Sequence, residues 1–201
     1  MAATHDGLFL PRFDPPLDRA ATRALVSAAT CRGGAVVGDP DSPYEVDITL
    51  VDLLAEHGRD RLRGLLELLV ALPGVPLLYA GSLLEVGNDP CYDPGEPRSI
   101  TRRRPVTVDP SAPPDTLLAV VRALTVRRGL PGLASGATTR VLAASDGLLW
   151  MSRSEGEDRI EVLANVAQSP MAVLVGGDDV LHRTREGATV PAHTTMWVRG
   201  T

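Results

Sequence analysis

The stretch RDRLRGLLELLVALPGVPLLYAG, residues 59–81, decides the fold class because it joins a helix pattern to a strand pattern. Leucines recur at helical spacing through residues 59–72 and form a wide apolar face. Pro73-Gly74 stops this helix, and residues 75–81 form a short, continuous apolar run that is typical of a buried parallel strand. A helix, a tight turn and a buried strand make half of a β/α repeat. The stretch therefore predicts an α/β fold.

Two further helices are expected, one on each side of this stretch. Apolar residues repeat at helical spacing over residues 17–32, and a Gly-, Asp- and Pro-rich loop is expected from there to about Pro43. The second helix is expected over residues 115–129, where arginines and a glycine stand at its C-terminal end. The polar stretch 85–114 is too long for a plain connection in a compact domain, so we expect a functional loop there.

After Pro131 the pattern changes to short runs of strand character, separated by the turn sequences SDG, SEGED, SP and GGDD. This alternation predicts a small antiparallel β domain in residues 131–201. The expected strands are residues 139–144, 148–152, 160–166, 171–175 and 194–199.

Composition narrows the class of protein. With 201 residues, of which 44% are hydrophobic, the chain can bury a core in one domain or two small ones. The formal net charge of -5 argues against a nucleic-acid partner, and no apolar run is long and uninterrupted enough to predict a membrane span. Cys31 and Cys91 are too few for a disulfide framework. We expect a protein of the reducing cytoplasm, with neither a nucleic acid nor a membrane as partner.

Several segments, in collinear order, resemble the α-amylase superfamily of glycoside hydrolases. THDG, residues 4–7, is similar to the motif at the end of the seventh barrel strand. LLVALPGVPLLYAGSLLEVGND, residues 68–89, resembles the eighth strand with the helix before it and the loop after it. LLAVVRALTVRRGLPGL, residues 117–133, followed by VLANVAQSP, residues 162–170, resembles the last barrel helix and the C-terminal β domain.

Two other segments look specifically like the sucrose phosphorylase branch of this superfamily. They are SPYEVDIT, residues 42–49, and EPRSITRR, residues 96–103. The sequence departs from that branch at Asp47 and Thr101, where the family usually has asparagine. The resemblance implies the C-terminal portion of a (β/α)8 TIM barrel in residues 1–130, with about strands 7 and 8 and their helices, followed by the antiparallel β domain in 131–201.

The resemblance also assigns roles to individual residues. His5 and Asp6 match the pair that contacts the donor sugar, where the aspartate stabilises an oxocarbenium-like transition state. Arg98 matches the arginine that holds the glucosyl group. Three residues fall in the loop that shapes the acceptor side in the phosphorylases: Tyr44, Asp41 and Glu45. Without the resemblance, the His-Asp pair would be interpreted as an ordinary turn. His57, His182 and His193 show no metal-ligand spacing and are expected at the surface.

The implied activity is retaining transfer of an α-glucosyl unit from a sugar substrate to inorganic phosphate or another acceptor, such as water, without a metal or cofactor. Retaining chemistry needs a nucleophile and a general acid/base, which this superfamily carries on its fourth and fifth strands. Those strands precede the THDG motif, so we expect the chain to be inactive alone and to need a separate N-terminal chain. Two alternatives remain open: a noncatalytic remnant or carbohydrate-binding or interaction module of the same superfamily, and a gene model begun at an internal Met.

Overall fold

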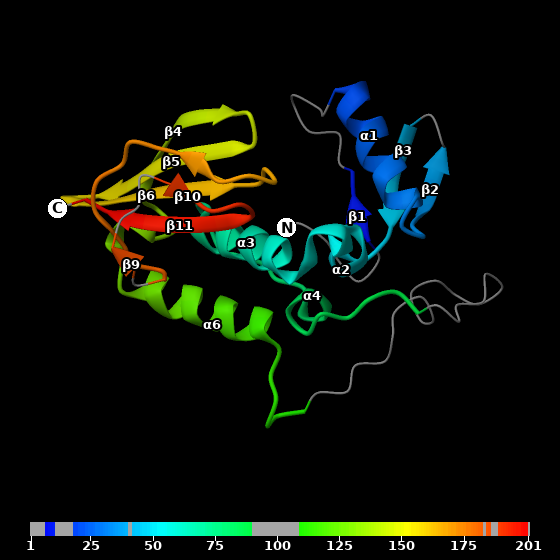
Figure 1. The fold of residues 1–201 in the computed structure, drawn as a ribbon, viewed down its shortest axis with the longest axis horizontal. Helices are drawn as coiled ribbons and strands as arrows, with labels where there is room; N and C mark the ends of the chain where they lie inside the picture. Colours follow the sequence, from blue (N-terminus) through cyan, green and yellow to red (C-terminus); the bar gives the residue numbers. More distant parts are fainter. Residues whose placement is uncertain are drawn as a thin grey trace. The chain divides into compact units, whose positions relative to one another are not determined.

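The computed structural model of the chain describes residues 7–10, 18–39, 42–89, 109–182, 184–185 and 189–200. The chain divides into two compact units. Unit 1 consists of Met1–Gly58 and Leu78–Pro114, and unit 2 of Arg59–Leu77 and Asp115–Thr201. Figure 1 shows the elements of each unit along the chain. The boundary predicted near residue 130 separates the barrel portion from the β domain, which is a different division from these two compact units. It stays a prediction.

Unit 1 contains a three-stranded antiparallel sheet with the strand order β1-β3-β2. The strands are β1 (Leu8–Phe9), β2 (Ala35–Asp39) and β3 (Ser42–Asp47). Its helices are α1 (Arg19–Thr30), α2 (Leu50–Leu53), a 3₁₀ turn (Ala55–His57) and α4 (Ala80–Leu83). The Asp18 carboxylate accepts a hydrogen bond from the Ala21 N–H at 2.7 Å, which caps the start of α1.

Unit 2 is built on a six-stranded sheet with the order β4-β5-β6-β11-β8-β9, in which all neighbouring strands are antiparallel. These strands are β4 (Thr138–Ser145), β5 (Leu148–Glu155), β6 (Asp158–Asn165), β8 (Asp178–Asp179), β9 (Thr184–Arg185) and β11 (Thr194–Arg199). A separate pair joins β7 (Met171–Ala172) to β10 (Thr189–Val190). The helices are α3 (Gly58–Ala71), α6 (Asp115–Arg128) and a 3₁₀ turn (Pro131–Leu133).

The sheet of unit 2 has side chains packed against both faces. On one face α3 comes close to β11: a Cβ on Gly64 would lie 2.3 Å from the His193 carbonyl oxygen, and the Thr195 hydroxyl donates to the Gly64 carbonyl at 2.8 Å. On the other face the β7 and β10 segments help to bury a second apolar cluster. That cluster consists of Leu163, Val173, Val190, Met196 and Val198.

The helices predicted at 17–32, 59–72 and 115–129 are confirmed as α1, α3 and α6. The strands predicted at 139–144, 148–152, 160–166 and 194–199 are confirmed as β4, β5, β6 and β11, whereas the strand predicted at 171–175 is limited to Met171–Ala172. No helix in the described part of the chain has the length and apolar character needed to cross a membrane.

Two local predictions are wrong. The strand expected at 75–81 is not formed, since residues 75–79 have no regular structure and α4 begins at Ala80. A parallel strand needs a neighbour to pair its backbone groups, and the described residues place none beside this segment. The loop expected up to Pro43 is a hairpin of β2 and β3, with a bulge between Val37 and Gly38.

Candidate functional site

The candidate site in unit 1 is built around β3, which carries Tyr44 and Glu45, two of the residues predicted to contact the sugar. Both therefore lie in a strand and not in the loop that was expected. The Tyr44 ring packs over Gly38 in β2, where a Cβ would lie 2.9 Å from the ring carbon Cδ1. Gly38 has φ +95°, which favours glycine, and Tyr44 remains 50% exposed. The hairpin therefore presents an aromatic ring that is held on one side and open on the other.

Acidic side chains alternate with an apolar one along β3. Glu45 and Asp47 are 8% and 2% exposed, and Val46 between them is fully buried. Because successive side chains of a strand point to opposite faces, the two carboxyl groups share one face. Both residues have an interaction partner, although one carboxyl oxygen of each, Glu45 Oε1 and Asp47 Oδ2, accepts no hydrogen bond from the described residues. Glu45 therefore lies within unit 1, and its predicted contact with the sugar stays a prediction.

The residue that follows His5-Asp6 packs directly on β3. A Cβ on Gly7 would lie 2.3 Å from the Val46 carbonyl oxygen and 2.8 Å from the Asp47 Cα, so only glycine fits there. The next residues form β1, which pairs antiparallel with Val46 and Glu45, and the Leu10 N–H donates to the Tyr44 carbonyl at 2.8 Å. Gly7, the residue that ends one segment resembling a sugar-site motif, is therefore a neighbour of the other such segment, residues 42–49, in unit 1.

Four predicted site residues lie outside the part of the chain that the structure describes: His5, Asp6, Asp41 and Arg98. Their predicted roles stay predictions.

Asp52 organises the described start of the loop that follows α4, and the sequence analysis did not single it out. Its Oδ2 accepts hydrogen bonds from the Thr49 hydroxyl at 2.7 Å and from the Asn88 N–H at 2.5 Å. The Thr49 hydroxyl in turn accepts from the Asp52 N–H at 3.0 Å and so caps α2. A Cβ on Gly87 would lie 3.0 Å from the other Asp52 oxygen, so the loop packs closely on this carboxylate. The spacing Thr-x-x-Asp is a capping-box pattern and is the sequence signal that would have identified Asp52.

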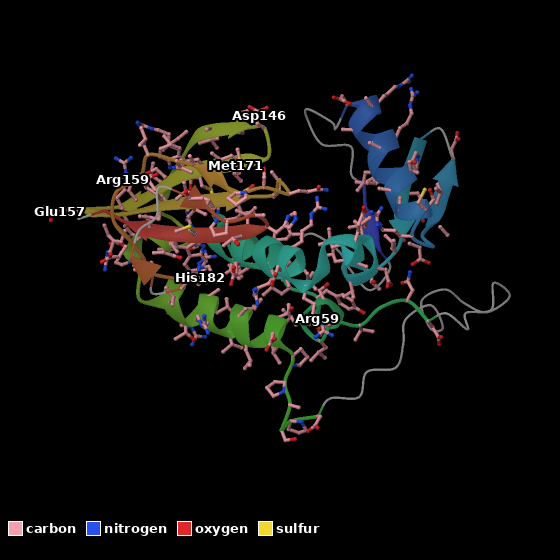
Figure 2. The ribbon with its side chains drawn as sticks, in the orientation of Figure 1. Arg59, Asp146, Glu157, Arg159, Met171 and His182 are labelled. Atoms are coloured by element: carbon pink, nitrogen blue, oxygen red, sulfur yellow. The ribbon has the colours of Figure 1, made fainter. Side chains whose placement is uncertain are left out.

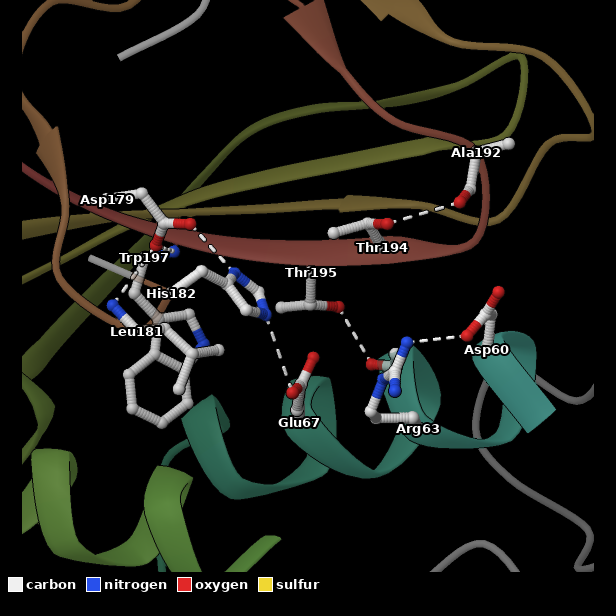
Figure 3. A network of polar contacts seen from close by, with 11 residues as sticks. Asp60, Arg63, Glu67, Asp179, Leu181, His182, Ala192, Thr194, Thr195 and Trp197 are labelled. Atoms are coloured by element: carbon white, nitrogen blue, oxygen red, sulfur yellow. Dashed lines mark hydrogen bonds and ion pairs between the residues drawn. The ribbon is translucent and has the colours of Figure 1, made fainter. Parts of the chain in front are cut away.

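Unit 2 contains a separate polar cluster around His182 (Figures 2 and 3), which contradicts the expectation that this histidine is a surface residue. Its Nδ1 lies 2.8 Å from Asp179 Oδ2 and its Nε2 lies 3.5 Å from Glu67 Oε1. The hydrogen bond with Asp179, and then the one with Glu67, raises the pKa of His182 to about 9, although burial opposes this. Glu67 comes from α3 and Asp179 from β8, so a charged imidazole links the helix to the sheet.

The other two histidines, His193 and His57, were also expected at the surface. His193 is half-buried rather than exposed, and it has φ +56° at the turn before β11. The side chain of His57 lies outside the described part of the chain. In the described part of the chain, no three His, Cys, Asp or Glu residues are arranged to hold a metal ion.

Comparison with known proteins shows which solved structures this fold resembles. No protein-family model matches the chain, and no curated protein matches it. Sucrose 6F-phosphate phosphorylase from Thermoanaerobacter thermosaccharolyticum is similar in structure, with a TM-score of 0.65 and 16% identity over 80% of this chain and 34% of that one. An α-glucosyl transfer enzyme, XgtA, gives 0.60 and 18% over 77% and 38%. An Anoxybacillus α-amylase gives 0.58 and 17% over 77% and 36%.

The chain spans 34–38% of the length of these three enzymes. The likeness is to their C-terminal part, and it shows that the chain has the fold of the C-terminal part of α-amylase family enzymes. The predicted fold class, a C-terminal barrel portion followed by an antiparallel β domain, is confirmed at this level.

Proposed function

We propose that the chain forms the C-terminal segment of a retaining α-glucosyl-transferring enzyme similar to sucrose phosphorylase. The observation that carries this proposal is the packing on β3 of Gly7, the residue that ends the THDG motif, because β3 carries the YEVDIT segment. In this proposal Asp6 stabilises the oxocarbenium-like transition state. Five residues hold the donor sugar or shape the acceptor side, where inorganic phosphate acts as co-substrate: His5, Arg98, Tyr44, Asp41 and Glu45.

The nucleophile and the general acid/base belong to another part of the enzyme. Retaining hydrolases and transferases place these two carboxyl groups about 5–5.5 Å apart, on either side of the scissile bond. None of the segments that resemble the superfamily corresponds to the strands that carry them. We therefore place both groups in a part of the barrel outside these 201 residues.

The exposed apolar residues of the segment 75–79 support a further barrel part. Val75 and Leu77 are 82% and 67% exposed, and they stand at alternate positions, as on one face of a strand. Side chains of this kind gain free energy when a neighbouring layer covers them. A strand from the missing part of the barrel, paired with this segment, would allow such a layer to form over both residues.

The test is glucosyl transfer by the complete assembly, that is, this chain together with the part that carries the carboxyl pair. The wild-type assembly should release glucose 1-phosphate from sucrose and phosphate. Asp6→Asn should lower kcat at least about 100-fold, because it removes a charge that stabilises the transition state. The matched control is Glu157→Gln, which removes one charge from an exposed side chain in the turn between β5 and β6 and should leave kcat unchanged.

An assembly that forms but transfers no glucosyl unit would contradict the proposal, and so would full activity of the Asp6→Asn variant. Either result would favour the alternative, a noncatalytic carbohydrate-binding or interaction module. Titration of the isolated chain with sucrose then distinguishes the two forms of that alternative, because only a carbohydrate-binding module binds the sugar.

A further inference from the structure

The face of the unit 2 sheet that lies opposite α3 is polar where the apolar cluster ends. Trp150 packs against that cluster, and Ser152 and Ser154 follow it on the same face of β5 because side chains alternate along a strand. A hollow of about 180 Å³ lies over the two serines. Its lining consists of Thr138, Arg140, Leu142, Ser152, Ser154 and Arg159.

The strand register arranges these side chains in two rows. Thr138 of β4 is opposite Ser154 of β5, which is opposite Arg159 of β6. In the next row Arg140 is opposite Ser152, which is opposite Glu161 of β6. Neighbouring strands lie about 4.8 Å apart and the rows about 6.8 Å apart along a strand. The two arginines therefore flank β5 diagonally, with serine hydroxyl groups between them.

One guanidinium in this hollow has no charged partner among the described residues. Arg140 forms no ion pair or hydrogen bond within the described part of the chain. Arg159 uses its Nε to donate to Glu161 Oε1 at 2.6 Å, which leaves its two terminal nitrogens for another partner. The second Glu161 oxygen accepts from Trp150 Nε1 at 2.8 Å, and Glu161 does not line the hollow. The lining therefore presents two cations and three hydroxyl groups, while the Glu161 carboxylate, beside Ser152, compensates Arg159 and leaves Arg140 as the excess charge.

We propose that this hollow binds a tetrahedral oxyanion, either inorganic phosphate or the phosphoryl group of a phosphate monoester. Guanidinium groups donate paired hydrogen bonds that match phosphate oxygens, and serine and threonine hydroxyls add further donors. The volume suits one phosphoryl group with a small substituent and is too small for a polymer. The site lies wholly in unit 2, so it does not depend on the proposed function.

A larger cavity of unit 2 does not compete for this assignment. It has a volume of about 440 Å³ and includes Arg127 and Arg128 in its lining. Arg127 already donates to the carbonyl oxygens of Val70 and Gly74, at the C-terminal end of α3. Both arginines also stand in the last turn of α6. Helix C-termini carry partial negative charge, which the arginines already balance there, so this cavity has no comparable excess of positive charge.

The experiment is a calorimetric titration of the full chain with inorganic phosphate, with glucose 1-phosphate and with glucose, together with amide NMR shifts. Both phosphate-bearing probes should bind, glucose should not, and the shifts should centre on Thr138, Arg140, Ser152 and Ser154. Arg140→Gln should weaken binding about tenfold, since it removes a charge-assisted donor pair. The matched control Arg122→Gln changes an exposed arginine of α6 and should leave affinity unchanged.

The outcomes separate the two sources of the oxyanion. Equal affinity for both probes assigns the site to free phosphate, whereas glucose 1-phosphate binding more than about fivefold tighter assigns it to a monoester. The proposal is overturned if neither probe shifts these amides, or if Arg140→Gln and Arg122→Gln weaken binding equally. Equal weakening by the two variants would mean that only the overall charge of the protein attracts the anion.

Discussion

Helices α1 and α3 have similar apolar periodicity in the sequence, yet they bury very different shares of their residues. Helix α3 buries seven of its 14 residues, whereas α1 buries one of its 12, Ala29. The reason is what each helix packs against. Helix α3 lies on a six-stranded sheet, and α1 contacts a three-stranded sheet whose longest strand has six residues. Periodicity shows that a helix has an apolar face, but not how much of that face is covered.

The same contrast holds for buried polar groups. In unit 2, Arg153 and His182 find their partners inside the unit, and those contacts join helix to sheet. In unit 1, the buried carboxyl groups of Glu45 and Asp47 lie in the segment that resembles a sugar-site motif. We infer that unit 2 supplies most of the stability, and the sugar-binding role stays a proposal for unit 1. Both tryptophans lie in unit 2, and the exposed Cys31 lies in unit 1, so each unit has its own fluorescence probe.

Among the variants that distinguish the two units, Arg153→Met should have the largest effect, a loss of stability in unit 2 alone. The fully buried guanidinium donates to the carbonyl oxygens of Ala71 at 2.8 Å, Leu133 at 3.2 Å and Ala134 at 2.5 Å. Methionine fills the volume but leaves these acceptors unpaired, so unit 2 should lose about 4 kcal/mol of unfolding free energy. Tryptophan fluorescence in urea measures this loss.

The control for this variant is Arg122→Met, at an exposed position of α6, which should change stability by less than about 0.5 kcal/mol. A label on Cys31, in a chain with Cys91→Ser, follows unit 1. Its urea midpoint should not move in Arg153→Met. A loss below about 1 kcal/mol in unit 2, or an equal shift of both probes, would remove the distinction between the units.

The second effect is a pH dependence confined to unit 2. The pKa of His182 is raised from 6.5 to about 9 by Asp179 and Glu67. A raised pKa means that the folded state holds the proton more tightly, so the stabilisation is complete below about pH 6.5 and disappears as the pH rises through about 9. The shift corresponds to about 3 kcal/mol. Urea midpoints followed by tryptophan fluorescence should therefore fall between pH 6.5 and pH 9.

His182→Gln is the matched variant, because glutamine keeps a hydrogen-bonding side chain but cannot be charged. Its stability should be lower than that of the wild type at pH 6 and nearly equal to it at pH 10. Parallel pH profiles for the two proteins would show that His182 is not the titrating group. The Cys31 label should report no corresponding pH dependence in unit 1.

The features that the sequence predicted correctly are local ones. Helix α6 is marked by its apolar spacing and by the arginines and glycine at its C-terminal end, and β4 to β6 are marked by alternation and turn sequences. The failures depend on neighbours. Residues 75–79 have a strand composition but no strand beside them within the described residues, and the β2–β3 hairpin is hidden by glycine and proline, which usually indicate a loop.

The contacts of the polar sites were even less predictable. Arg153 reaches the Ala71 carbonyl across 82 positions of the sequence, and His182 meets Glu67 from a different element. Nothing in their immediate sequence distinguishes these residues from surface arginines and histidines. Asp52 is the exception, because its partner Thr49 stands three residues earlier in a capping-box pattern. Sequence can reveal a polar contact when both partners lie within one turn of a helix.

Asp52→Ala should have the smallest of these effects, and it should be confined to unit 1. The variant removes the acceptor of the Thr49 hydroxyl and of the Asn88 N–H, and water can replace part of the loss at Asn88, which is half-buried. We expect about 1 kcal/mol less stability for the Cys31-labelled unit and an unchanged tryptophan transition. Thr49→Ala should have a similar effect, whereas Thr49→Ser keeps the hydroxyl and should restore the wild-type value. If Thr49→Ser were as unstable as Thr49→Ala, the methyl group and not the hydrogen bonds would hold α2 to the loop.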